Sequence, residues 1–220
     1  MALSRPFCAP EQLERNWEHA VLMRVLIYGT LAVVAALLLA DTNLGTSVGK
    51  YGRQAVSTAV AHLEKRGMTS DADVAGRLAA SDGFRESKIY GYIVRLARSS
   101  DLDFSFYAYT PLLSRSRVFI GESFWDVGVV GRSSVLIHEI AHITRHQERL
   151  LGGFPRSADE AQAYRRQYLT YRAVGLSPST DGIAYWNMMM GIYTYVLPAY
   201  PEYQYRPDVR LAMRELGLGD

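Results

Sequence analysis

The chain has 220 residues, of which 49% are hydrophobic and 21% are charged. This composition excludes an intrinsically disordered protein, and the length is enough for one domain with a short appendage. The net charge of +2 is too small to indicate a nucleic-acid-binding protein. Because Cys8 is the single cysteine, the chain has no intramolecular disulfide, and a metal would have to be held by histidines and carboxylates.

The first predicted element is a hydrophobic segment near the N-terminus. Residues 1–19 are polar and of mixed charge, whereas residues 25–40 carry no charge at all. Extended back to Ala20, the hydrophobic segment is about as long as a bilayer is thick, and Arg24 lies close enough to its end to reach the interface. We therefore predict a transmembrane signal anchor over residues 20–40, with the domain that follows it outside the cytoplasm. A cleaved signal peptide and a helix buried in the core are the alternatives.

The remaining chain predicts a mostly helical α+β domain over residues 53–220, joined to the anchor by a glycine-containing linker over residues 41–52. Helix-forming patterns end or begin at glycines and at Ser or Thr caps. Alternating patterns are typical of strands. In chain order, the expected helices cover residues 53–66, 70–82, 87–98, 133–151, 158–174, 180–193 and 209–216, with strands over 103–109 and 117–121 before the fourth helix and an irregular segment over 197–207.

The most informative pattern is H-E-x-x-H, formed by His138, Glu139 and His142. On a helix, residues i and i+4 share one face, so both imidazoles can reach one ion. Neutral imidazole is a good zinc ligand, and zinc lowers the pKa of water that it binds. Glu139 can take the proton of that water without ligating the metal. The uncharged neighbours of the motif indicate a buried helix. The sequence therefore predicts zinc-assisted hydrolysis, with Glu139 as general base.

On these residues the segment resembles the zincin metallopeptidases. The resemblance covers the motif helix, the strand before it and one helix after it. It implies a zincin-like domain with a small β-sheet beside the motif helix, a Zn²⁺ cofactor, and a peptide or protein substrate held along the edge strand. It also implies a third zinc ligand downstream of His142.

Three residues are candidates for this third ligand. His146 follows His138 by eight residues on the same helix, about 12 Å along its axis, which is too far for one ion. Glu160 opens the sequence E-A-Q-A, which resembles the E-x-x-A element of the gluzincins, where the Glu is the third ligand. Asp159 is the alternative and would make the site resemble the aspzincins, although the G-T-x-D-x-x-Y-G element of that group is absent. We therefore predict His138, His142 and Glu160 as the metal ligands.

Tyr164 lies four residues after Glu160 and shares its helix face. Several gluzincins have an aspartate at this position that orients a zinc-bound histidine, so the partners of the two histidines stay unassigned. A phenol can stabilise the oxyanion of the reaction, and we expect Tyr164 to take this role, with Tyr168 one turn further along.

These patterns together predict a membrane-anchored zinc metallopeptidase. One alternative is a catalytically inactive zincin-fold protein that binds or scaffolds partners at the membrane. Another is a structural membrane protein in which the motif arose by chance. The presence of Glu139 argues against an inactive site, because a site freed from catalysis has no chemical need for that carboxylate.

Overall fold

The computed structural model describes residues 28–29, 46–86, 107–110, 116–121, 123–145 and 156–218. The chain divides into two units, Met1–Leu44 and Gly45–Asp220. Across the described ranges, no helix is both long enough and apolar enough to cross a bilayer. The predicted anchor lies outside the described residues except for Tyr28 and Gly29, and the predicted helix over 87–98 lies outside them entirely.

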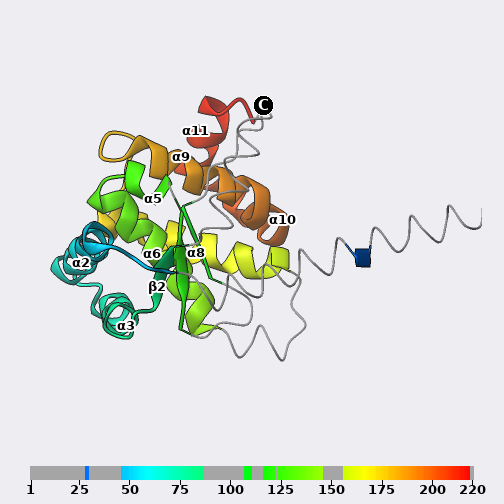
Figure 1. Cartoon of the computed structure of the whole chain (residues 1–220). Helices are drawn as coiled ribbons and strands as arrows, with labels where there is room; N and C mark the ends of the chain where they lie inside the picture. Colours follow the sequence, from blue (N-terminus) through cyan, green and yellow to red (C-terminus); the bar gives the residue numbers. More distant parts are fainter. Residues whose placement is uncertain are drawn as a thin grey trace, which may run out of the picture. The chain divides into compact units, whose positions relative to one another are not determined.

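The second unit is mostly helical with one small sheet, which confirms the α+β prediction. Figure 1 shows the elements. The first half contains β1 (Thr46–Ser47), α2 (Lys50–Lys65), α3 (Thr69–Ala80), β2 (Phe84–Glu86), β3 (Ala108–Tyr109), β4 (Val118–Ile120), α5 (Ser123–Asp126) and α6 (Val129–Thr144). The second half contains α8 (Arg156–Val174), α9 (Gly182–Gly191), the π-helical turn η1 (Ile192–Val196), α10 (Leu197–Ala199), the 3₁₀ turn η2 (Pro201–Tyr205) and α11 (Pro207–Glu215).

The described strands form a single sheet in the order β1-β2-β4-β3. β2 and β4 are parallel, and the two outer strands are antiparallel to their neighbours. The pairing of Ala108 with Ile120 and of Tyr109 with Phe119 fixes the register of β3. The two aromatic rings of the second pair stack at 5.1 Å, which adds a cross-strand contact. The strands predicted over 103–109 and 117–121 are confirmed where the structure describes them, and β3 lies at the edge of this sheet.

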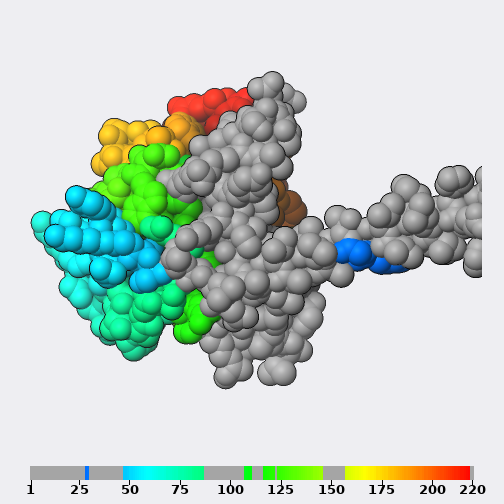
Figure 2. Space-filling model, in the orientation of Figure 1, coloured from blue at the N-terminus to red at the C-terminus, as the bar shows by residue number. Residues whose placement is uncertain are grey.

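Helix α6 lies at the centre of the unit, in contact with α2, α3, α8 and α9. Its aliphatic residues point in several directions, and each reaches an apolar cluster. Leu136 and Ile140 pack with residues of the sheet such as Phe84, while Ile137 packs with Leu63 of α2. Figure 2 shows α2 and α3, in cyan and teal, packed against the green segment that contains α6. The absence of charged neighbours in the motif is thus explained by burial on all sides.

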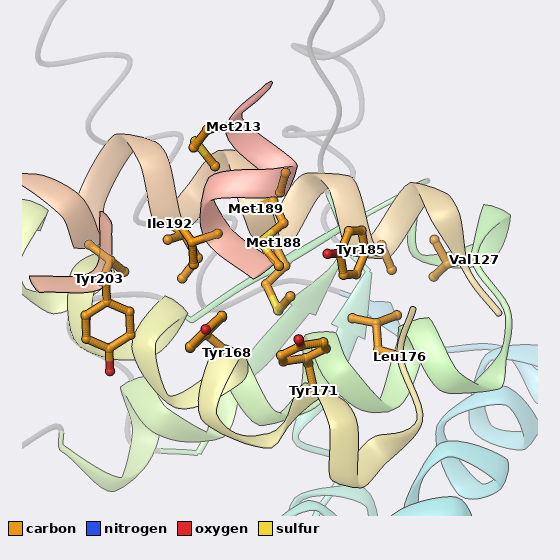
Figure 3. Close-up of a cluster of buried hydrophobic side chains, with 14 residues drawn as sticks. Val127, Tyr168, Tyr171, Leu176, Tyr185, Met188, Met189, Ile192, Tyr203 and Met213 are labelled. Carbon is orange, nitrogen blue, oxygen red and sulfur yellow. The ribbon is translucent and has the colours of Figure 1, made fainter. Parts of the chain in front are cut away.

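A second core joins α8, α9 and α11 (Figure 3). Met188 and Met189 of α9 are fully buried against the tyrosines Tyr168 and Tyr171 of α8. The run of methionines and aromatic residues in this helix predicts core packing, which is confirmed for Met188 and Met189, whereas Met190 is 40% exposed. The segment 197–207, predicted to be irregular, contains α10 and η2.

The sequence predicts that Ser133 or Ser134 caps the motif helix. The structure shows a different start. Helix α6 begins one turn earlier, at Val129, with Gly128 as its N-cap. Ser133 Oγ donates instead within the helix interior, to the carbonyl of Val129. The cap comes from a distant residue, because Asp181 Oδ2 accepts a hydrogen bond of 2.7 Å from the Gly128 N–H. Local sequence holds no sign of such a long-range cap.

The linker predicted over residues 41–52 is wrong for its second part, and residues 41–45 lie outside the described ranges. Thr46–Ser47 pairs with β2, and α2 begins at Lys50. Gly52 is buried, and a Cβ on it would lie 2.8 Å from Val48 Cβ and 3.1 Å from the Trp125 ring. This glycine allows close packing and does not serve as a flexible spacer.

Asp181 caps two helices with one carboxylate. The sequence predicts Thr180 as the cap of α9, but in the structure Asp181 takes this place. Its Oδ1 accepts from the Ala184 N–H at 3.2 Å, while its Oδ2 binds the start of α6. A lost cap costs about 1 kcal/mol, so we expect Asp181→Ala to lower the free energy of unfolding by about 2 kcal/mol. Urea unfolding checks this value, with Asp181→Asn expected to lose less. An unchanged free energy of unfolding in Asp181→Ala would show that neither helix depends on this carboxylate.

Candidate metal centre

The site is built across the interface between α6 and α8. Ser134 of α6 meets Gln167 of α8, and His142, two turns later, meets Asp159 near the start of α8. The two helices therefore run in opposite directions along a shared row of polar side chains. His138, four residues after Ser134 and four before His142, lies between these two contacts.

Three side chains converge in the middle of this row. His138 Nε2 lies 3.2 Å from His142 Nε2, and Glu160 Oε2 lies 3.4 Å and 3.7 Å from these two atoms. A point equidistant from the three atoms lies about 2.0 Å from each, the usual length of a zinc–nitrogen or zinc–oxygen bond. Both histidines are buried, and Glu160 is partly buried. The group can therefore hold a metal ion.

Asp159 orients His142 and does not belong to the converging group. Its Oδ2 accepts a hydrogen bond of 2.8 Å from His142 Nδ1, the ring nitrogen on the far side from the group. This bond leaves the Nε2 lone pair directed at the centre. The alternative in which Asp159 is the third ligand is thus not supported, and one of the missing partners is now assigned. For His138, Nδ1 has no hydrogen-bond partner among the described residues.

The site is strongly electronegative. Burial by itself lowers the pKa of His142, but the hydrogen bonds to Asp159 and Glu160 and the charge of Glu139 raise it to about 9. Burial likewise raises the pKa of the Glu160 carboxyl, yet the two imidazoles hold it well below its usual range. Three carboxylates around two imidazoles favour a cation at this position.

Glu139 lies beside the candidate metal ligands and is held by a residue that follows a strand of the sheet. Thr110, which directly follows β3, donates a hydrogen bond of 2.8 Å from its Oγ1 to Glu139 Oε2. Glu139 as a whole is only 3% exposed. Its second oxygen, Oε1, makes no hydrogen bond to any described residue. One oxygen is therefore fixed while the other is available for a ligand.

Tyr164 stands against the first histidine. Its ring meets that of His138 at 4.3 Å in an edge-on arrangement, and on its other side it stacks on Tyr195 of η1 at 5.6 Å. A Cβ at Gly191 would collide with the Tyr164 ring, so this glycine is needed for the ring to lie where it does. Burial, followed by the charge of Glu160, raises the pKa of the Tyr164 phenol above its usual range. The phenol therefore remains neutral at physiological pH.

A pocket of about 140 Å³ opens beside these side chains. His138 and Glu139 form part of its wall, with contributions from the sheet, α6, α8 and α9. The other lining residues are Tyr107, Ala108, Val135, Tyr164, Gln167 and Asn187. A small ligand in this pocket would touch the candidate base and a candidate metal ligand together.

The structure brings together the five residues that the sequence singled out: His138, Glu139, His142, Glu160 and Tyr164. His146 lies outside the described residues. Tyr168 is not part of the site, because its hydroxyl donates to Asp208 of α11.

Sequence reasoning missed Thr110, Gln167 and Asn187. Gln167 follows Glu160 by seven residues, so its place on the same helix face could have been read from spacing. Thr110 and Asn187 reach the site through tertiary packing alone.

Comparisons of the chain with protein-family models, with curated proteins and with solved structures found no match.

The hydrogen bond between Thr110 and Glu139 predicts a graded effect on catalysis. We expect Thr110→Val, which keeps the shape but removes the hydroxyl, to lower turnover about ten- to a hundredfold, because the carboxylate loses a charge-assisted hydrogen bond. Thr110→Ser should stay near wild type. Turnover and metal content of both variants check this, and Thr110→Val should add no further loss to Glu139→Gln. Additive losses would mean that Thr110 acts by another route.

Proposed function

We propose that this protein is a membrane-anchored zinc metallopeptidase that hydrolyses peptide bonds. The observation that carries the proposal is the convergence of two imidazole nitrogens and a carboxylate oxygen at zinc-ligand spacing, with the buried Glu139 beside them. A set of three protein ligands made of histidines and a carboxylate is typical of catalytic zinc, which keeps a fourth position open.

His138, His142 and Glu160 would hold the ion, and Asp159 would keep His142 in the tautomer that presents Nε2 to it. When bound, zinc supplies Lewis-acid chemistry: it polarises a carbonyl and makes a water more acidic. The electronegative surroundings described above favour the dication and oppose a free anion at this point.

Glu139 supplies the proton transfers. Its Oε1 accepts a proton from the attacking water as the water oxygen bonds to the carbonyl carbon, and then delivers that proton to the nitrogen of the departing amine. Thr110 holds Oε2, so the carboxylate keeps one orientation through both transfers. Water thereby adds across the C–N bond, and the base returns to its starting state.

Tyr164 completes the arrangement as a hydrogen-bond donor. Because its phenol stays neutral, it can stabilise negative charge that develops on the carbonyl oxygen. Its position beside His138, fixed by Gly191 and Tyr195, keeps this donor near the reacting atoms.

An extended peptide fits the surroundings of the site. β3 is paired with β4 on one side only, among the strands that the structure describes, and Tyr107 and Ala108 line the pocket. Main-chain groups on such an edge can pair with an extended chain. The membrane part of the proposal rests on the hydrophobic segment over residues 20–40, which carries no charge after Arg24.

The proposal is tested with the full-length protein stripped of metal by a chelator and then given one equivalent of zinc. We expect cleavage of fluorogenic peptides from a mixed-sequence library to be absent in the stripped protein and restored by zinc. Stoichiometric zinc binding without cleavage of any peptide would favour the inactive, partner-binding alternative. Failure to bind zinc would reject the metal centre itself.

A further inference from the structure

The pocket beside the metal centre contains two side-chain amides that the catalytic proposal does not use. Gln167 comes from α8 and Asn187 from α9, and both line the same space as His138 and Glu139. A group bound next to the reacting atoms would therefore meet these amides. Their hydrogen-bonding state indicates what kind of group this is.

Gln167 is buried, with 4% of its surface exposed. Within the described part of the chain, only one of the two polar atoms of its side-chain amide has a hydrogen-bond partner. Its Nε2 donates a hydrogen bond of 3.0 Å to Ser134 Oγ, whereas Oε1 has no partner among the described residues. A buried acceptor without a donor is unfavourable unless a ligand supplies one. By comparison, Gln162 on the same helix donates to the Tyr200 hydroxyl and is not among the residues that line the pocket.

Asn187 adds a second amide to the same wall. It is partly buried and makes no hydrogen bond to any residue that the structure describes. Among the described residues that line the pocket there is no Lys or Arg that would select an anionic group. The volume of about 140 Å³ is smaller than the roughly 300 Å³ at which pockets for drug-sized ligands begin, which favours a short group.

We propose that this pocket is a recognition subsite for a short, uncharged group that carries a hydrogen-bond donor, such as a hydroxyl or a primary amide. The inference rests on the proposed function and adds a substrate class to it. Gln167 Oε1 accepts from the donor, and the Asn187 amide offers a second contact. In a peptide, the pocket selects Ser, Thr or Asn beside the scissile bond over Ala or Val, because a site built to pair a polar group rejects an analogue that lacks it.

Two small hydroxamates test the subsite without knowledge of the natural substrate. A hydroxamate chelates an open zinc, and butanohydroxamate and 3-hydroxypropanohydroxamate differ only in a terminal methyl or hydroxyl. Their dissociation constants are measured by calorimetry on the zinc-loaded, full-length protein. We expect the hydroxyl compound to bind the wild type at least about tenfold more tightly.

Variants of the two glutamines provide the matched comparison. Gln167→Met keeps the length of the side chain and should abolish the preference for the hydroxyl compound, whereas Gln162→Met on the same helix should retain it. Asn187→Leu, on a different helix, should reduce the preference for the hydroxyl compound. It serves as the test if Gln167→Met does not fold. Acetohydroxamate, whose chain ends at the methyl next to the carbonyl and is too short to reach the amides, should bind all folded variants alike.

Equal binding of the two hydroxamates to the wild type, or a preference that survives in both Gln167→Met and Asn187→Leu, would overturn the subsite. If zinc is bound but acetohydroxamate is not, the open metal position is missing, and the proposed function falls together with the subsite. The two failures are thus distinguished by the compound that lacks the terminal group.

Discussion

Glu139→Gln is expected to keep the fold and the zinc but to lower turnover at least about a hundredfold, the scale of general acid–base assistance. Glutamine has nearly the same shape and can still accept the hydrogen bond that Thr110 donates to Oε2. It cannot take a proton from water. Steady-state kinetics on a cleavable peptide, together with metal analysis, give the two numbers that are needed.

The control for Glu139→Gln is its thermal stability. Because Glu139 is buried and its partner Thr110 is a neutral hydroxyl, removing the charge should not destabilise the unit. Unfolding near the wild-type temperature would show that lost activity is chemical. A variant that binds zinc and cleaves at the wild-type rate would remove Glu139 from the mechanism.

His142→Ala is expected to abolish stoichiometric zinc binding and activity together. The change removes one of three converging ligand atoms, together with the imidazole that donates to the buried Asp159. Two protein ligands do not normally retain a catalytic zinc against a chelator. Equilibrium dialysis against a zinc-buffering chelator measures the affinity directly.

Asp159→Asn is the graded companion of His142→Ala. It keeps all three ligands but weakens the hydrogen bond that orients His142, so zinc affinity should fall about ten- to a hundredfold and not vanish. Complete loss of zinc in Asp159→Asn would indicate that Asp159 is itself a ligand. Unchanged affinity would mean that the orientation of His142 does not depend on this carboxylate.

Much of the candidate metal centre could be predicted from sequence because its parts follow helical spacing. His138 and His142 share a face of α6, and Glu160 and Tyr164 share a face of α8. The uncharged residues around the motif likewise indicated burial, and Leu136 and Ile137 are indeed inaccessible. These features depend on local periodicity, which the sequence shows directly.

The rest depends on contacts between residues far apart in the chain. Asp181 caps α6 across 53 positions, and Thr110 reaches Glu139 across 29. Asp159 was considered only as a ligand, because its role becomes clear when the second nitrogen of His142 is seen beside it. In the sequence, a glycine that allows close packing looks the same as a glycine in a flexible linker. Gly52 belongs to the first kind, because it packs against Trp125.

The most direct test of the central claim is anomalous diffraction at the zinc edge from crystals of the zinc-loaded protein. The account predicts one strong peak about 2.0–2.2 Å from His138 Nε2, His142 Nε2 and a carboxylate oxygen of Glu160, with Asp159 on the outer nitrogen of His142. A peak elsewhere in the chain, or Glu160 turned away from a metal held by other ligands, would contradict it.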